Sequence, residues 1–192
     1  GMNAMVVTDD KRIVDECFRY DIPVDIITEP CKTGTDRVAR AAAKLTKTDW
    51  IINVQGDMPD ITPYIIHSVH DLLIRGFPVA TAYTDMEPEK REVPHVVKVI
   101  HNNDKARWFG RGFTRYGDHH LGIYGYHTKQ LEQYRKLTQY PEEKIEKLEQ
   151  LRWLQNDVNI QMVKVPFDGI EINTPHDYLL WKNNNGMKDG DK

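Results

Sequence analysis

The chain has 192 residues, of which 40% are hydrophobic and 29% charged, and its 26 basic against 29 acidic side chains leave a formal net charge of −3. This composition excludes disordered, collagen-like and fibrous proteins, and it fits a globular domain with a sizeable core. The small net charge argues against a general binder of nucleic acid or of membranes, whereas a small anionic ligand in a local basic cleft is compatible with it.

The cysteines and the hydropathy pattern indicate a cytoplasmic location. No apolar run reaches the roughly 18 to 20 residues of a membrane-spanning helix, and the first residues do not resemble an export signal. Cys17 and Cys31 form no CxxC pair, so we expect two small packing residues in a reducing compartment. The eight histidines lack the spacing of a structural zinc site, and we expect none.

Short apolar runs alternate with helical patterns in the first half of the chain. Trp50 to Val54 is almost continuously apolar, which is typical of a strand buried on both faces of a parallel sheet. Thr62 can cap the following helix, Pro63 suits its first turn and Gly76 can end it. The elements expected before residue 50 are, in chain order, strand 4–8, a helix with Ile13, Val14, Cys17 and Phe18 at helical spacing, strand 24–27 and helix 36–45.

The second half continues the alternation. Residues 84–94, rich in charge and proline, read as an exposed excursion. Thr174 can cap a last helix that has Pro175 at its first position. The remaining expected elements are strands 79–83, 96–100, 121–126 and 160–165, a short helix 128–136, and a longer helix 142–154 with Ile145, Leu148, Leu151 and Leu154 buried.

This order of elements predicts an α/β fold with right-handed crossovers and a mainly parallel, Rossmann-like sheet. We expect one domain over residues 1–182, within which 84–126 forms a smaller strand-rich lobe, and a flexible tail over 183–192.

Two segments are candidates for chemistry by position. Asp57 follows a predicted strand, where ligands bind in open parallel sheets, and one carboxylate there suits Mg²⁺. The alternative is that Asp57 only caps the turn before Pro59. Gly34, Thr35, Asp36 and Arg37 open a helix whose N-terminal amides favour anions, so they could hold a nucleotide. Ordinary helix capping by Thr and Asp is the competing interpretation.

The motifs are more specific together than any one of them is alone. In order and context they resemble the 3-deoxy-manno-octulosonate (KDO) cytidylyltransferases, also called CMP-KDO synthetases, over nearly the whole chain. The motifs that carry this resemblance are Val6–Asp10, Gly34–Arg37, Asn53–Pro59, Val96–Val99, His120–Tyr126, Leu148–Arg152 and Thr174–Asp177.

The resemblance implies Mg²⁺-dependent transfer of a cytidylyl group from CTP to the anomeric hydroxyl of KDO, with release of pyrophosphate, for lipopolysaccharide biosynthesis. It also implies a fold of the nucleotide-diphospho-sugar transferase type and a homodimer with residues 84–126 at the interface. The roles it implies are catalysis by Asp57 and Arg111, nucleotide binding by Gly34, Thr35, Asp36 and Arg37, sugar binding by Gln55, Arg111, His120, Tyr124, Glu149 and Gln150, and metal binding by Asp57 and at the position of Asn173.

Some of these residues have a simpler structural interpretation. His120 and Tyr124, four apart in a predicted strand, lie on one face and could form a hydrogen-bonded pair in the core. Glu149 and Arg152, three apart on a predicted helix, could form an exposed ion pair.

The chain departs from the family pattern in two places. Family members begin with a strand and a basic loop resembling PARxxSxRxPGK, whereas this sequence proceeds from Ala4 to what resembles their second strand. Asn173 stands where the family has a metal-binding Asp, and our hypothesis is that Glu171, on the same side of an extended segment, reaches the metal directly or through water. The alternative is a plain loss of metal affinity. These departures keep open the alternative of a non-catalytic sugar-binding or assembly homologue. Among enzymes, the alternative is an acylneuraminate-type cytidylyltransferase.

Overall fold

Two short strands near the N-terminus pair with each other, and the later strands form a separate six-stranded sheet. The structure, a computed structural model, describes residues 2–45, 48–112 and 115–186. The strands are β1 (Val6–Thr8), β2 (Val24–Ile26), β3 (Trp50–Val54), β4 (Val79–Thr84), β5 (Lys98–Asn102), β6 (Lys105–Gly110), β7 (Asp118–His127) and β8 (Ile160–Lys164). The helices are α1 (Lys11–Arg19), α2 (Gly34–Ala42), α3 (Pro63–Ile74), α4 (Thr128–Tyr134), α5 (Pro141–Glu146), α6 (Leu151–Gln155) and α7 (Pro175–Asn184), with a 3₁₀ turn at Pro88–Lys90.

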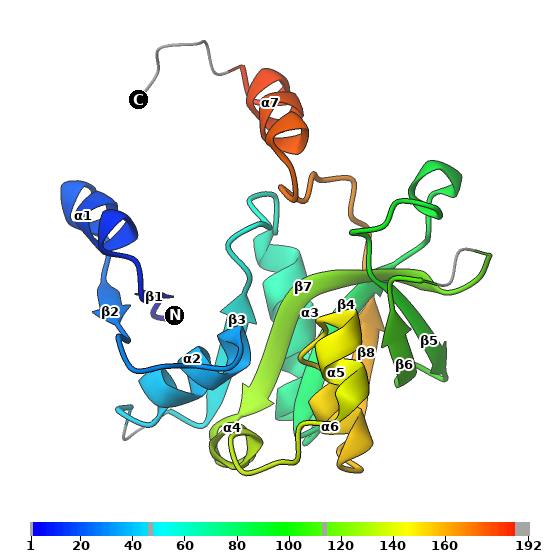
Figure 1. Cartoon of the computed structure of the whole chain (residues 1–192), viewed down its shortest axis with the longest axis horizontal. Coiled ribbons are helices and arrows are strands. Elements are labelled where there is room, and N and C mark those ends of the chain that lie inside the picture. The colour runs from blue at the N-terminus through cyan, green and yellow to red at the C-terminus, as the bar shows by residue number, and fades with distance from the viewer. Residues whose placement is uncertain (1, 46–47, 113–114, 187–192) are drawn as a thin grey trace.

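The larger sheet is mixed, with the strand order β3-β7-β4-β8-β6-β5. A further pairing of β7 with β5 closes β7, β4, β8, β6 and β5 into a barrel-like ring (Figure 1). Among the described strands of this sheet, only β4 and β8 pair in parallel. The predicted α/β class is confirmed, but the expectation of a mainly parallel, Rossmann-like sheet is wrong.

The parallel prediction fails because of β7. β3, α3 and β4 form a crossover between strands of the same direction, as the alternation of elements indicates. β7, however, returns from far along the chain and inserts between β3 and β4, antiparallel to both. β3 therefore lies at the edge of the described sheet, and Trp50 and Val54 are 36% and 38% exposed rather than buried on both faces.

β6 was not predicted, and its hairpin with β5 explains how the ring closes. The strands are joined at Asn103 and Asp104, which have φ of +51° and +57°. Two consecutive residues in the left-handed region are typical of a type I′ turn, whose twist matches that of the flanking strands. Lys105 and Arg107 alternate with apolar residues in β6, so the sequence signal for this strand is weaker than that of a continuously apolar run.

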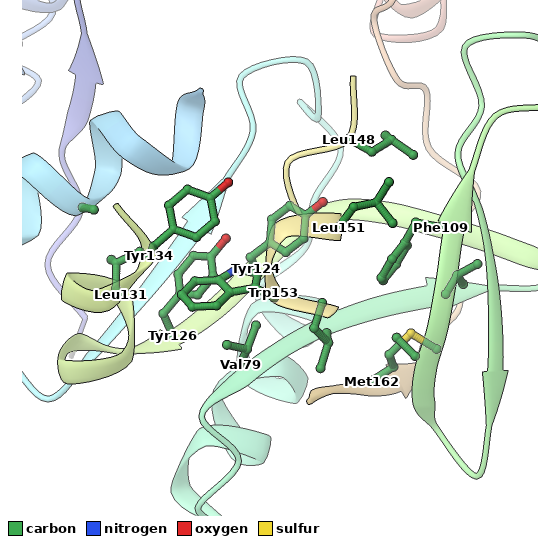
Figure 2. Packing of buried hydrophobic residues seen from close by; sticks show 14 of the residues in the cluster. Val79, Phe109, Tyr124, Tyr126, Leu131, Tyr134, Leu148, Leu151, Trp153 and Met162 are labelled. Carbon is green, nitrogen blue, oxygen red and sulfur yellow. The ribbon is translucent and has the colours of Figure 1, made fainter. Parts of the chain in front are cut away.

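The hydrophobic residues form two clusters, one on each face of the larger sheet. β4 is buried along its whole length, with Ala80 and Ala82 in the cluster beneath α3 and Val79 and Tyr83 in the opposite cluster. Figure 2 shows the aromatic part of the opposite cluster, where side chains from β7, α4 and α6 meet. Its largest members are Tyr124, Tyr126, Tyr134 and Trp153.

Local signals at the helix ends are confirmed. The Thr62 side chain accepts a hydrogen bond from the backbone N–H of Ile65 at 3.4 Å, and Gly76, with φ of +92°, follows the end of α3. Thr174 and Asp177 form a reciprocal capping box at the start of α7. α7 extends to Asn184, two residues into the expected tail, and residues 187–192 lie outside the described residues.

The single helix predicted over 142–154 is wrong. α5 ends at Glu146, Lys147 adopts a left-handed conformation with φ of +54°, and α6 begins at Leu151. Leu148 and Leu151 are buried as expected, but Ile145 is 77% exposed. The interruption matters for the site because it places residues 147–150 in an irregular segment.

α1 buries fewer of its apolar side chains than their helical spacing indicates. Val14 and Cys17 are buried, whereas Ile13 and Phe18 are 46% and 68% exposed. Cys17 and Cys31 are both free thiols; Cys17 is buried, as expected of a packing residue, whereas Cys31 is only partly buried. Over the described residues, every helix is too short or too polar to cross a bilayer.

Candidate active site

A small cleft of about 80 Å³ gathers residues from segments that are far apart in the sequence. Its walls come from the end of β3, from β7, from the segment after β6, and from the irregular segments before α6 and α7. The predicted sugar and metal residues all line it: Gln55, Asp57, Arg111, His120, Tyr124, Glu149, Gln150, Glu171 and Asn173.

Asp57 and Glu171 place two carboxyl groups in this cleft. The backbone N–H of Ile172 donates to the Asp57 carbonyl at 2.8 Å, which fixes the segment of Glu171 beside the end of β3. Burial and the negative charge of Glu171 both raise the pKa of the Asp57 carboxyl. The Asp57 Oδ1 atom is buried and has no hydrogen-bond partner. A buried, unpaired carboxylate oxygen beside a second carboxylate is costly unless a cation binds there.

Arg111 also lines the cleft, and hydrogen bonds of its backbone and of its side chain hold it in place. Its N–H donates to Glu146 Oε2 at 3.0 Å, and its guanidinium donates to the carbonyl of His95. The ammonium of Lys98 donates to the Arg111 carbonyl at 3.1 Å and to that of Val93 at 3.2 Å. A guanidinium fixed in this way can form parallel hydrogen bonds with a ligand carboxylate.

Lys98 is a supporting residue that the sequence interpretation did not assign. It is 1% exposed, and burial, followed by the positive charge of Arg111, lowers the pKa of its ammonium. A lysine in the otherwise apolar run Val96–Val99 is the signal that could have identified it, because a buried ammonium requires acceptors. His95 and Lys147, which also line the cleft, carry no comparable signal.

His120 and Tyr124 lie side by side on β7, with ring centroids 5.3 Å apart. His120 Nε2 lies 3.0 Å from Thr81 Oγ1, and the ring packs against Phe109. Both residues are buried, as the core interpretation expects, and both also line the cleft. The hydrogen bond expected between them is replaced by a ring contact, and Thr81 is a hydrogen-bonding partner of His120 Nε2. Burial, with smaller effects of His119 and Arg111, lowers the pKa of His120 to about 3.

Acidification is expected to destabilise the protein through His120. The folded chain keeps this ring neutral down to about pH 3, whereas an unfolded histidine has a pKa of about 6.5. The unfolded state therefore binds more protons, and stability is lost as the pH falls from about 6.5 towards 3. At pH 5 the loss is about 2 kcal/mol.

Urea unfolding at pH 7 and pH 5 measures this effect. The wild-type loss of unfolding free energy between the two pH values should exceed that of His120→Gln by about 2 kcal/mol. Equal losses in the two proteins would contradict the assignment of the proton to His120.

α2 approaches the cleft through Glu149. Glu149 Oε2 accepts a hydrogen bond from the backbone N–H of Thr35 at 2.6 Å, and a side chain at Gly34 would come within 3.2 Å of this carboxylate. Arg37 pairs with Asp9 at the surface. The predicted nucleotide residues thus lie next to the cleft, at the N-terminus of α2, rather than in its wall.

The expected exposed pair of Glu149 and Arg152 is wrong. Arg152 is 1% exposed and forms two hydrogen bonds with Glu143, at 2.6 and 2.9 Å, and a longer contact with Asp36 at 3.4 Å. Its guanidinium also lies 4.1 Å from the centre of the Tyr134 ring. This buried network joins α2 to α5 and α6, and so holds the nucleotide segment against the cleft.

The residues present fit a hard divalent cation that takes only some of its ligands from the protein. Within residues 2–45, 48–112 and 115–186, no three His, Cys, Asp or Glu side chains converge in a way that could hold a metal ion. Mg²⁺ commonly uses one or two carboxylates and completes its shell with water and substrate phosphate oxygens. The unpaired oxygen of Asp57 and the nearby Glu171 match this pattern, and Asn173 adds a neutral amide at the same wall.

Comparison with known proteins decides the family. The profile of the family described as Cytidylyltransferase matches residues 2–160. The chain belongs to the cytidylyltransferase family. Among curated cytidylyltransferases, the 3-deoxy-manno-octulosonate cytidylyltransferase of Nitratiruptor sp. is 35% identical over 90% of this chain and 79% of its own length. The mitochondrial 3-deoxy-manno-octulosonate cytidylyltransferase of Arabidopsis thaliana is also 35% identical, and there the chain spans 65% of the relative.

Solved structures agree with this family. A CMP:2-keto-3-deoxy-manno-octonic acid synthetase complexed with CTP superposes with a TM-score of 0.86 at 27% identity, over 96% of this chain and 81% of the other. A putative glucose-1-phosphate thymidylyltransferase from Bacillus anthracis, at 11% identity, matches with a TM-score of 0.68 over 98% of this chain and 78% of its own. The second likeness shows that the nucleotidyltransferase-type fold extends beyond cytidylyltransferases.

Proposed function

We propose that this chain transfers a cytidylyl group from CTP to the anomeric hydroxyl of KDO and releases pyrophosphate, in the route to lipopolysaccharide. The observation that carries the proposal is the cleft, which holds both a buried unpaired carboxylate oxygen on Asp57 and a fixed guanidinium on Arg111. The names of the 35% identical relatives and the likeness to a synthetase complexed with CTP support the same substrates.

The proposed chemistry is mainly one of positioning. The oxygen of the anomeric hydroxyl attacks the α-phosphorus in line, the bond to the pyrophosphate oxygen breaks, and the hydroxyl proton is released to water. Arg111 binds the sugar carboxylate, while Gln55, His120 and Tyr124 supply hydrogen-bonding groups for the hydroxyls. His120 acts as a neutral ring, because its pKa is lowered to about 3. Mg²⁺ held by Asp57 and Glu171 would neutralise the charge that develops on the phosphates.

α2 is the proposed nucleotide-binding element. Its N-terminus has Gly34 and Thr35 next to the cleft wall at Glu149. Backbone N–H groups at a helix N-terminus favour anionic or strongly polar groups, and here the Glu149 carboxylate already accepts the Thr35 N–H, so CTP would bind at α2 by displacing Glu149 from it. Arg37, in the same first turn, supplies a cation. Asp36 is engaged with Arg152 and Thr33, so we expect it to position the helix rather than to touch CTP.

The direct test is pyrophosphate release from CTP by the purified chain with Mg²⁺ and KDO. Release that requires KDO supports the proposal. Release with an acylneuraminate but not with KDO would assign the chain to the acylneuraminate type. KDO binding by calorimetry without any release would make it a non-catalytic sugar-binding homologue, and would overturn the proposed transfer.

Gly122, which lies next to Gln55, offers a test of the proposed sugar binding by Gln55. A Cβ at Gly122 would lie 2.7 Å from the Gln55 side-chain oxygen, so Gly122→Ala must shift the amide of Gln55 from its place in the cleft wall. Losing one hydrogen bond to a ligand is expected to raise the KM for KDO about tenfold, with the KM for CTP unchanged. Gly112→Ala, where a Cβ meets nothing within 4 Å, is the matched control. Equal KM values for KDO in the two variants would contradict this role of Gln55.

We further propose a homodimer in the cytoplasm, where CTP is available. Residues 84–126 are the proposed interface, because the loop between β4 and β5 projects beyond the sheet (Figure 1). Sedimentation equilibrium should give twice the chain mass, and a monomer at micromolar concentration would contradict the dimer.

A further inference from the structure

His119 is a buried histidine that the proposed chemistry does not use. It lies on β7 next to His120, and successive side chains of a strand point to opposite faces. His120 therefore contacts Tyr124 and the cleft, whereas His119, 1% exposed, contacts a different part of the chain. Its Nε2 lies 3.1 Å from Oε1 of Glu171, a distance at which the ring can donate its proton to the carboxylate.

Glu171 depends on such a contact for its orientation. It lies in the irregular segment between β8 and α7, so no regular backbone holds its side chain. Over the described part of the chain, the hydrogen bond to His119 is the only one found for its carboxylate. The side chain is 16% exposed and lines the cleft, and its negative charge acts on Asp57.

We propose that His119 is a positioning residue that holds the Glu171 carboxylate towards the cation site beside Asp57. The inference rests on the proposed function, because it assumes that Mg²⁺ binds at these carboxylates. A carboxylate has about four lone-pair sites, so one bond to a ring nitrogen orients the group and leaves others for a cation. Metal-binding groups are commonly oriented by such hydrogen bonds from a second layer of residues.

Because residue 173 is an asparagine, the negative charge that this segment brings to the cation site comes from Glu171. An amide oxygen is neutral, and Asn173 donates its backbone N–H to Asp177 at the start of α7. The nearest carboxylate on this segment is two residues earlier, at Glu171, and His119 is what fixes it from β7. The cation site thus consists of groups from the end of β3 and from the segment before α7, with support from β7.

Mn²⁺ binding to the full chain in the presence of CTP, followed by electron paramagnetic resonance, tests the inference without measuring turnover. His119→Phe keeps the ring volume but removes the donor, and should weaken Mn²⁺ binding by about tenfold. His119→Gln keeps a donor and should restore most of the affinity. His101→Phe is the matched control, because His101 forms a similar pair with Asp118 at 2.8 Å but does not line the cleft.

A double-mutant cycle separates orientation of Glu171 from a general effect on folding. In a Glu171→Gln background, His119→Phe should weaken Mn²⁺ binding no further. If His119→Phe does not fold, His119→Asn, whose shorter amide cannot reach Glu171, is compared with His119→Gln in its place. Wild-type Mn²⁺ affinity in His119→Phe would overturn the inference alone. Absence of Mn²⁺ binding to the wild type would overturn it together with the proposed metal site, while pyrophosphate release still tests the transfer.

Discussion

Replacing Asp57 with asparagine is expected to lower pyrophosphate release from CTP roughly a thousandfold. A bound cation supplies several kcal/mol of charge stabilisation in the transition state, and each factor of ten corresponds to about 1.4 kcal/mol. Asparagine keeps the shape of the side chain but is a poor ligand for Mg²⁺. The rate under saturating CTP, KDO and Mg²⁺ measures the effect, with Asp85→Asn, at an exposed ion pair with Lys164, as the control.

The same substitution should not lower stability. Burial and Glu171 raise the pKa of Asp57, so its charge is unfavourable in the folded protein without a cation. Neutralising it should leave the thermal midpoint measured without metal unchanged or higher. A variant that loses both activity and stability would indicate a structural role, and one that retains wild-type turnover would remove Asp57 from the proposed reaction.

Arg152→Met is expected to have the largest effect on stability. Arg152 pairs with Glu143 and Asp36 inside the protein, and removing one partner of a buried ion pair leaves an uncompensated charge. The expected loss is about 3 to 5 kcal/mol of unfolding free energy, measured by urea denaturation at pH 7.

Two further variants identify the cause of that loss. Arg19→Met breaks an exposed pair with Glu16 and should cost less than about 1 kcal/mol. Adding Glu143→Met to Arg152→Met should recover part of the stability, because it removes the charge left without a partner. A loss below about 1 kcal/mol in Arg152→Met would show that the network contributes little to the fold.

The position of the cleft could be predicted because strand ends have local signals. Gln55 and Asp57 follow a clear apolar run, and the structure places both in the cleft. Glu171 was reached from its spacing to Asn173 in an extended segment. His119 was not assigned, because its role depends on a contact with a residue 52 positions later in the chain.

The topology could not be predicted because it depends on long-range pairing. The pattern of β7 indicates a strand but not that it lies between β3 and β4. Likewise, the spacing of Ile145, Leu148 and Leu151 fits one helix, and nothing local shows that Lys147 interrupts it. Burial of Glu143 and Arg152 was unexpected for the same reason, because each is buried only by virtue of its partner.

The register of β7 affects which ligands the cleft can recognise. Adjacent histidines on this strand have different surroundings, since His120 lines the cleft and His119 contacts Glu171. A slip of β7 by a single residue would exchange them. Ladders to β3, β4 and β5 oppose such a slip, with one irregularity opposite Thr81 and Ala82 that falls near Gly122. The alignment of the strand, and not only the identity of its side chains, therefore determines what the cleft can bind.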